Sequence, residues 1–231
     1  MAGISYMTCI TTPDPDKSMF PEAIRQITGN LSFRADTTGC SGDEVYLFGN
    51  ELILKVSKDP ERLKRERERT DFLRAQGVPG SESVVSLEEG GKSYYLRTLI
   101  CGDSLIAPRF LENPERLIDA LANVVGVLRG LDAVLCPFCS TDNAGNDFVH
   151  GDLCLPNIYV NERDEFAGFI DLYNSGRGDR WYDYAWLLWS MQYNLKTDRY
   201  CQRLLDKLGI PFERRKYEQY VPEEYRPAGQ N

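Results

Sequence analysis

Residues 150–157 read His-Gly-Asp-Leu-Cys-Leu-Pro-Asn, and residues 170–172 read Ile-Asp-Leu. The two stretches supply three oxygen-bearing side chains in a fixed order, namely Asp152, Asn157 and Asp171. Transfer of a phosphoryl group requires a carboxylate that orients the attacking hydroxyl, together with oxygen ligands that hold Mg²⁺. The order of these residues therefore predicts a phosphoryl-transfer site, and with it a kinase-type fold.

The catalytic loop of protein kinases, H-R-D-x-x-x-x-N followed by D-F-G, has the same order, although glycine here replaces the arginine and leucine the phenylalanine. We expect Asp152 to accept a hydrogen bond from the substrate hydroxyl and to take its proton late in the reaction. Asn157 and Asp171 are expected to hold Mg²⁺. His150, the only histidine of the chain, is expected to tie the loop together by hydrogen bonds.

The pattern of apolar residues predicts two lobes around these motifs. The first half shows β-rich patches separated by polar turns, with one charged helix that opens at Asp59-Pro60 and runs through Ala75. The second half is mainly helical. We therefore expect an α+β, bilobal protein-kinase-like fold. A nucleotide-binding lobe at residues 1–100 would hold an antiparallel sheet and one helix, and a helical catalytic and acceptor-binding lobe would follow at 101–231.

The expected elements can be given by residue range. Strands are expected at 31–35, 44–48, 51–56, 83–87, 93–99, 149, 158–160 and 166–170, and further helices at 20–27, 114–131, 181–191 and 198–208. The lobes are expected to meet near residues 98–102, and the tail after Pro222 is expected to fray.

A single lysine, Lys55, lies inside an apolar strand pattern. Burial of a cation without a partner is costly, and in kinases this strand lysine pairs with nucleotide phosphates and with a helix glutamate. The charged helix offers Glu61, Glu66 and Glu68. Helical spacing places Glu66 on the same face as Leu63, so we expect it to point inward to Lys55. The alternative is a helix whose charges are all solvated.

A glycine-rich phosphate loop is missing from the sequence, in both its kinase form and its P-loop form. The nearest substitute is Gly-Cys-Ser-Gly-Asp at residues 39–43, between two expected strands. Its backbone N–H groups could cradle a phosphate, or the segment could be a plain hairpin turn. The residues alone leave both interpretations open.

Two acids follow the second motif. Asp179 comes directly before an aromatic helix and is expected to be its N-cap. Asp183, in the first turn, suits the positive end of the helix dipole or braces the catalytic loop. The aromatic residues of this helix are expected to belong to the core.

The composition is that of an ordinary soluble protein, with 231 residues, 42% hydrophobic and 27% charged, and a net charge of −8. This charge argues against a general nucleic-acid partner and is compatible with a cationic substrate. No apolar run approaches the roughly 20 residues of a membrane span, and residues 1–16 lack a signal-peptide pattern. We therefore expect a cytoplasmic protein with no membrane partner.

The seven cysteines are irregularly spaced, which argues against a disulfide framework. Cys136 and Cys139 form one C-x-x-C pair, but the second pair or the histidines of a structural zinc site are missing. Whether this pair has a role is left open by the sequence.

Taken together, the motifs resemble the aminoglycoside phosphotransferase family, particularly its 3′ type. The matching text is His-Gly-Asp-Leu with Asn157, then Ile-Asp-Leu, then Gly-Arg-Gly-Asp-Arg-Trp-Tyr-Asp at 176–183. Weaker agreement around Lys55 and Glu66 extends the likeness over residues 39–212. The resemblance implies a protein-kinase-like fold and ATP- or GTP-dependent transfer to a hydroxyl group. By the family pattern, Asp152 is catalytic and Lys55 pairs with Glu66.

The resemblance has further implications for nucleotide and metal. It implies that Asn157 and Asp171 are the Mg²⁺ ligands, and that the hinge holding the base lies between Thr98 and Ile100. It also implies that Ser41 reaches toward the phosphates from the polar turn.

One departure from the family concerns the acceptor. Members carry a long helical insertion before the H-G-D strand, and its acids hold the aminoglycoside. Here residues 133–148 are too few for those helices, and the only acids in this segment are Asp142 and Asp147. Later acids could also face a substrate, namely Glu213, Glu218, Glu223 and Glu224. An aminoglycoside is the first expectation for the acceptor, whereas antibiotic resistance follows from the family name alone.

Other functions compete with this hypothesis. A kinase for another small metabolite, such as a sugar or an amino alcohol, would use the same phosphotransfer residues. A non-catalytic nucleotide-binding module of the same fold need not keep them all. A metal hydrolase built on His150 lacks further histidine ligands. The sequence leaves open ATP versus GTP, the hydroxyl that is modified and the oligomeric state.

Overall fold

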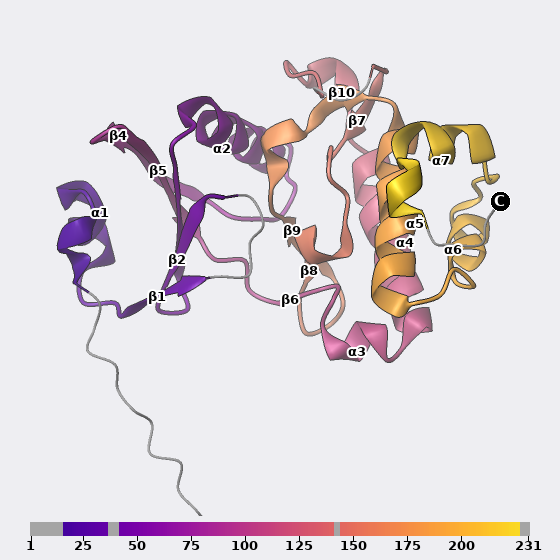
Figure 1. The fold of residues 1–231 in the computed structure, drawn as a ribbon, viewed down its shortest axis with the longest axis horizontal. Coiled ribbons are helices and arrows are strands. Elements are labelled where there is room, and N and C mark those ends of the chain that lie inside the picture. Colours follow the sequence, from indigo (N-terminus) through magenta and orange to yellow (C-terminus); the bar gives the residue numbers. More distant parts are fainter. Residues whose placement is uncertain (1–15, 37–41, 141–143, 227–231) are drawn as a thin grey trace, which may run out of the picture.

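An antiparallel sheet in the spatial order β1-β2-β3-β5-β4 forms the N-terminal lobe. The computed structural model describes residues 16–36, 42–140 and 144–226. Figure 1 shows the sheet-rich lobe beside a helical lobe, so the predicted bilobal α+β fold is confirmed. The elements of the first lobe are α1 (Glu22–Thr28), β1 (Phe33–Asp36), β2 (Glu44–Phe48), β3 (Leu52–Ser57), α2 (Pro60–Ala75), β4 (Ser83–Glu89) and β5 (Lys92–Thr98).

The two faces of this sheet differ in chemistry, because successive strand residues point to opposite sides. One face is apolar, with the buried Leu54 and Leu96, and it packs with α1 in a cluster that includes Ile24. The other face carries the charged side chains of Lys55 and Arg97, which reach toward α2. Alternation along β3 and β5 therefore separates the core of the lobe from its site.

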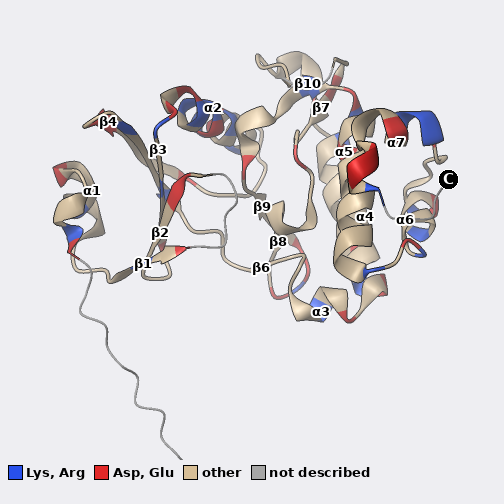
Figure 2. Ribbon diagram, viewed as in Figure 1, with Lys and Arg blue, Asp and Glu red and all other residues tan. Residues whose placement is uncertain are grey.

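Helix α2 begins and ends where the local signals predict. The Asp59 side chain caps it by accepting from the Arg62 N–H at 3.2 Å, and Pro60 occupies the first turn. Gly77, just past the end, has a φ of +79°. Figure 2 shows blue and red segments along this helix. Its inward face includes the residues that helical spacing selects, namely Leu63, Glu66, Thr70 and Leu73, and Arg69 is buried beside them.

Five helices form most of the second lobe within the residues that the structure describes. Their apolar faces share one core, which α4 enters with a buried stripe from Leu117 to Leu128. Two of the helices, α3 and α7, are not among those predicted, and the helix predicted at 198–208 begins at Cys201. The bounds are α3 (Pro108–Leu111), α4 (Pro114–Arg129), α5 (Arg180–Leu195), α6 (Cys201–Leu208) and α7 (Arg214–Tyr220).

Short strands hold the two motifs in this lobe. β7 (Asp147–Val149) pairs with β10 (Gly176–Gly178), and β8 (Ile158–Val160) lies between β6 (Asp103–Ser104) and β9 (Phe166–Phe169). The segment at 150–157 thus runs from β7 into β8, and Asp171 follows β9. Both motifs are loops anchored at each end by paired backbone.

The end of the described chain is tied down. Residues Glu223–Tyr225 form a 3₁₀ turn, and Arg226 donates to the backbone oxygens of Val221 at 2.8 Å and Glu218 at 2.6 Å. The expectation that the tail frays after Pro222 is therefore wrong as far as Arg226. The Arg226 side chain holds this segment by hydrogen bonds to the preceding helix end, which the sequence pattern did not indicate. Within the described ranges, no helix is long and apolar enough to cross a membrane.

Candidate active site

The catalytic loop depends on a glycine at its second position. Gly151 has a φ of +82°, and a Cβ built on it would lie 2.5 Å from the backbone oxygen of Asn174. Only glycine adopts this conformation readily and leaves room for the neighbouring chain. This contact explains why the kinase arginine is replaced here: the loop packs directly on the segment that follows Asp171.

Asp183 of α5 holds the same loop from the other side. Its two carboxylate oxygens accept from the backbone N–H of His150 at 2.6 Å and of Gly151 at 2.9 Å. Burial raises the pKa of Asp183 to about 7, although the two N–H donors act to lower it. Of the two roles considered for this residue, bracing the loop is therefore present in the structure. Asp179, as predicted, caps α5 by accepting from the Trp181 N–H.

His150 is completely buried beneath the loop. Its Nδ1 accepts from the backbone N–H of Asp152 at 3.2 Å, and its ring packs edge-on against Phe169. Burial lowers the pKa of His150, which favours the neutral ring. The histidine thus fixes the backbone at Asp152, in keeping with the positioning role expected for it.

Asp152 and Asn157 are in direct contact. The Asn157 side-chain nitrogen donates to Oδ2 of Asp152 at 2.9 Å and to the Asp152 backbone oxygen at 3.0 Å. Because the amide nitrogen is engaged in this way, the amide oxygen is left to face another group. The loop therefore presents one carboxylate and one amide oxygen side by side.

Lys55, Glu66 and Asp171 form a second group, in which β3 and α2 of the first lobe meet the segment after β9. The Lys55 ammonium lies 2.9 Å from Oε2 of Glu66 and also pairs with Oδ1 of Asp171. Burial acts to lower the pKa of Lys55, but the two carboxylates outweigh it and raise the pKa. Burial likewise acts to raise the pKa of Asp171, and Lys55 outweighs it in the lowering direction. Both side chains are therefore held in their charged forms.

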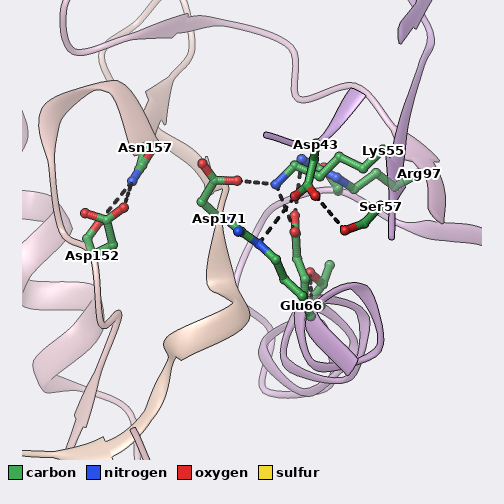
Figure 3. Close-up of polar contacts among 11 residues, drawn as sticks. Asp43, Lys55, Ser57, Glu66, Arg97, Asp152, Asn157 and Asp171 are labelled. Atoms are coloured by element: carbon green, nitrogen blue, oxygen red, sulfur yellow. Dashed lines mark hydrogen bonds and ion pairs between the residues drawn. The ribbon is translucent and has the colours of Figure 1, made fainter. Parts of the chain in front are cut away.

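Figure 3 shows the two groups facing each other across the gap between the loops, with the second oxygen of Asp171 turned toward Asn157. The backbone also joins the two motifs, since the backbone N–H of Ile170 donates to the backbone oxygen of Asn157 at 3.0 Å. Asp171 itself has a φ of +59°, a conformation that is uncommon outside glycine and that clusters at functional sites. The predicted residues at positions 55, 66, 152, 157 and 171 are thus brought into one region.

The donors suit a magnesium ion. A carboxylate oxygen of Asp171 and the amide oxygen of Asn157 are the hard oxygen ligands that Mg²⁺ prefers, with water and substrate phosphates completing its coordination. Within the described residues, no cluster of three or more His, Cys, Asp or Glu side chains could hold a metal alone. A magnesium site here would therefore depend on the nucleotide for further ligands.

The remaining nucleotide residues are placed less completely. Ser41 lies outside the described residues. Thr98 is the last residue of β5, and Ile100 follows in the connection to β6, where the Leu99 N–H donates to the Glu51 backbone oxygen at 2.7 Å. The hinge role of these two residues stays a prediction. Ile100 is buried and would be 2.9 Å from a Cβ built on Gly168.

Two charged residues at the site were not singled out from the sequence. Arg97 of β5 lies 3.6 Å from Oε1 of Glu66 and is only 3% exposed. Asp43, at the end of the polar turn, accepts from Ser57 at 2.6 Å and pairs with Arg62 of α2 at 3.3 Å. Arg97 carries the same signal as Lys55, a lone cation within an apolar strand, whereas Asp43 has no distinctive pattern.

The acids proposed for the acceptor have varied surroundings. Asp142 lies outside the described residues, and Asp147 pairs with Arg180. Glu213 accepts from the Trp181 indole at 3.0 Å, and Glu218 pairs with Arg214. Of the named acids, Glu223 and Glu224 lie exposed in the C-terminal turn. Cys136 and Cys139 are free thiols in the loop before β7.

Comparison with known proteins identifies similar phosphotransferases. A model of the phosphotransferase enzyme family matches residues 146–220, which include the catalytic loop. An aminoglycoside 3′-phosphotransferase from Enterococcus faecalis is 39% identical over 241 residues, covering 80% of this chain and 90% of the relative. A probable aminoglycoside 3′-phosphotransferase from Lactococcus lactis is 26% identical over 233 residues, covering 82% and 88%.

Solved structures show the same fold. The aminoglycoside phosphotransferase APH(3″)-Id from Streptomyces rimosus superposes with a TM-score of 0.73 at 21% identity, covering 85% of this chain and 93% of that one. That enzyme has also been solved with ADP and streptomycin. An aminoglycoside 3′-phosphotransferase of type VIII superposes with a TM-score of 0.72 at 21% identity, covering 86% and 94%.

Proposed function

This chain belongs to the aminoglycoside phosphotransferase family, and from that premise we propose that it transfers the γ-phosphoryl group of ATP or GTP to a hydroxyl of an aminoglycoside-type acceptor. The observation that carries the proposal is that two groups of side chains face each other: Lys55 paired with Asp171, and Asp152 hydrogen-bonded to Asn157. A nucleotide-binding module without chemistry would have no need for the second group.

Each residue has a role that its contacts support. Asp152 accepts the proton of the acceptor hydroxyl and aims its oxygen at the phosphorus. Lys55, oriented by Glu66, neutralises the phosphate oxygens of the nucleotide. Asn157 and Asp171 would hold Mg²⁺, which offsets charge on the phosphates when bound. His150 and Asp183 keep the backbone of the loop in place.

An aminoglycoside is proposed as acceptor on two grounds. The named relatives are aminoglycoside phosphotransferases, and a chain with a net charge of −8 attracts a polycation. The exposed acids Glu223 and Glu224, held in place by the turn at the C-terminus, are the candidates for contact with its ammonium groups.

A second acceptor class is favoured by a specific observation. Three of the named acids are already engaged within the chain, because Asp147 pairs with Arg180, Glu213 with Trp181 and Glu218 with Arg214. Together with the short segment at 133–148, this leaves fewer charges for a polycation and suits a smaller sugar or amino alcohol.

The experiment measures nucleotide-dependent phosphorylation of kanamycin, neomycin, choline and simple sugars, each with Mg·ATP and Mg·GTP. We expect turnover with at least one aminoglycoside. If only a neutral sugar is phosphorylated, the proposed acceptor class is wrong and the proposed phosphoryl transfer stands. Hydrolysis of a phosphate ester in the absence of nucleotide would point to a hydrolase and contradict the proposal.

A further inference from the structure

We propose that Arg97 is a positioning residue that holds Glu66 in place while Lys55 serves the nucleotide phosphates. The inference rests on the proposed function, since it assigns a second cation to the same site. Arg97 lies on β5, and its polar side-chain contacts among the described residues are the ion pair with Glu66 and the hydrogen bond to Ser81. We therefore assign its effect on the nucleotide to the orientation of Glu66.

The pairing of strands places this arginine beside the lysine. In the β3–β5 ladder Ile53 is opposite Arg97 and Lys55 is opposite Tyr95, so both cations lie on the same face of the sheet. Figure 3 shows Lys55 and Arg97 reaching side by side toward Glu66 on α2. The two oxygens of Glu66 are divided between them, Oε2 to Lys55 at 2.9 Å and Oε1 to Arg97 at 3.6 Å.

Burial makes this arrangement consequential. Lys55, Glu66 and Arg97 are 6%, 1% and 3% exposed, so water does not offset their charges. With Asp171 they form two cations and two anions, a neutral group. A single lysine facing two carboxylates would be drawn between them, and less of its charge would be available to an incoming phosphate.

Arg97 is itself held in position from the far side. Its Nη1 donates to the hydroxyl of Ser81 at 2.8 Å, in the segment between α2 and β4. Its Nε is buried and has no hydrogen-bond partner within the described residues. The guanidinium is therefore anchored by one contact and directed at Glu66 by the other, which is the geometry of a support rather than of a group that moves to substrate.

The test compares Arg97→Met and Arg97→Lys with the matched control Arg74→Met, which removes an exposed ion pair of α2 with Glu82. Affinity is measured with a nonhydrolysable analogue of Mg·ATP, without acceptor. We expect Arg97→Met to weaken binding about tenfold, and Arg97→Lys and Arg74→Met to stay within about twofold of the parent. In steady-state assays the nucleotide KM should rise while the acceptor KM is unchanged.

The double variant Glu66→Gln/Arg97→Met sharpens the result. If Arg97 acts through Glu66, the arginine substitution should weaken binding far less in the Glu66→Gln background, because no buried carboxylate is left unpaired. Arg97→Met with a lower melting temperature but unchanged nucleotide affinity would overturn the inference and leave a structural role only.

Failure of the inference and failure of the proposed function give different results. If the parent chain does not bind the nucleotide analogue, the proposed function fails before Arg97 is tested. If the parent binds and Arg97→Met binds equally well, only the inference fails. Should Arg97→Met not fold, Arg97→Gln takes its place, because it also removes the cation and can still hydrogen-bond Ser81. We expect about a tenfold loss of nucleotide affinity in that variant, and an affinity within about twofold of the parent overturns the inference.

Discussion

The residues proposed to serve the nucleotide (the nucleotide side) and the acids proposed to meet the acceptor (the acceptor side) hold their charges in different ways. On the nucleotide side, Lys55, Glu66 and Arg97 are almost inaccessible, and both cations form ion pairs with Glu66. On the acceptor side, Glu223 and Glu224 stand exposed on a 3₁₀ turn. A buried charge must have a partner in a particular place, whereas an exposed charge is solvated wherever it lies.

This difference has a consequence for specificity. The buried network can serve only one geometry, so it is suited to the phosphotransfer step that members of the family share. Exposed acids can be moved or replaced at little cost in stability. The acceptor is therefore the part of the function that can change between relatives without disturbing the fold.

The largest expected effect is on the catalytic carboxylate. Asp152→Asn should lower turnover by about a thousandfold, because the acceptor hydroxyl loses its proton acceptor, while affinity for Mg·ATP stays within about twofold. The control is Asp147→Asn on the acceptor side, which breaks only the partly exposed pair with Arg180. Unchanged turnover in Asp152→Asn would contradict the role given to this residue.

Next in size is the backbone of the catalytic loop. Gly151→Ala should cost about 2 kcal/mol of unfolding free energy, through a strained φ and the clash with the Asn174 oxygen, and should lower turnover. Gly126→Ala is the matched control, because this glycine lies within α4 and a Cβ there meets nothing within 4 Å. Gly126→Ala should raise the unfolding free energy by about 0.5–1 kcal/mol. Urea denaturation of both variants distinguishes the two sites, and equal effects would show that the loop tolerates a side chain.

A smaller and pH-dependent effect is expected at Asp183. Burial raises the pKa of Asp183 to about 7, and the charge of Asp152 adds to the rise. Between about pH 4 and pH 7 the folded chain therefore keeps a proton that the unfolded chain has lost, so this group makes the unfolding free energy fall as pH rises through that window.

Asp183→Asn removes this titration and one hydrogen-bond acceptor, at a cost of about 1–3 kcal/mol. The destabilisation relative to the parent should be larger at about pH 5 than at about pH 8, because the extra proton of the folded parent is lost between them. Urea denaturation at both pH values checks the sign. If the difference in unfolding free energy between the parent and Asp183→Asn grows as pH rises, the carboxylate is charged in the folded loop.

The smallest effect is expected on the acceptor side. Glu223→Gln and Glu224→Gln should raise the KM for a polycationic acceptor by about threefold each, since exposed ion pairs are weak, and should leave the nucleotide KM unchanged. Added salt should reduce the difference from the parent by screening. If neither variant responds for any cationic acceptor, these acids take no part in binding.

Local signals predicted several features of the fold well. Asp59-Pro60 and Gly77 defined the bounds of α2, and its spacing placed Glu66 inward, because capping and helical periodicity act over a few residues. Two helices, α3 and α7, were missed because each is only a turn or two long and has little periodicity to detect.

Features that depend on distant contacts were harder to predict. The tie between Arg226 and Glu218 and the bonds from Asp183 to the catalytic loop join residues whose patterns are unrelated. Arg97 had a visible signal, a cation within an apolar strand, but its partner on α2 depends on how β3 and β5 pair. The roles proposed for Ser41, Thr98 and Ile100 stay predictions.

The order of Asp152, Asn157 and Asp171 by itself determined the chemistry, because few arrangements of side chains serve phosphoryl transfer and this one is short enough to read along the chain. The tertiary structure alone decided which charges stand behind those residues. Strand pairing and the approach of α2 to the sheet selected Glu66 and Arg97 as partners of Lys55, since burial forces each charge to find its neighbour across elements that are far apart in the sequence.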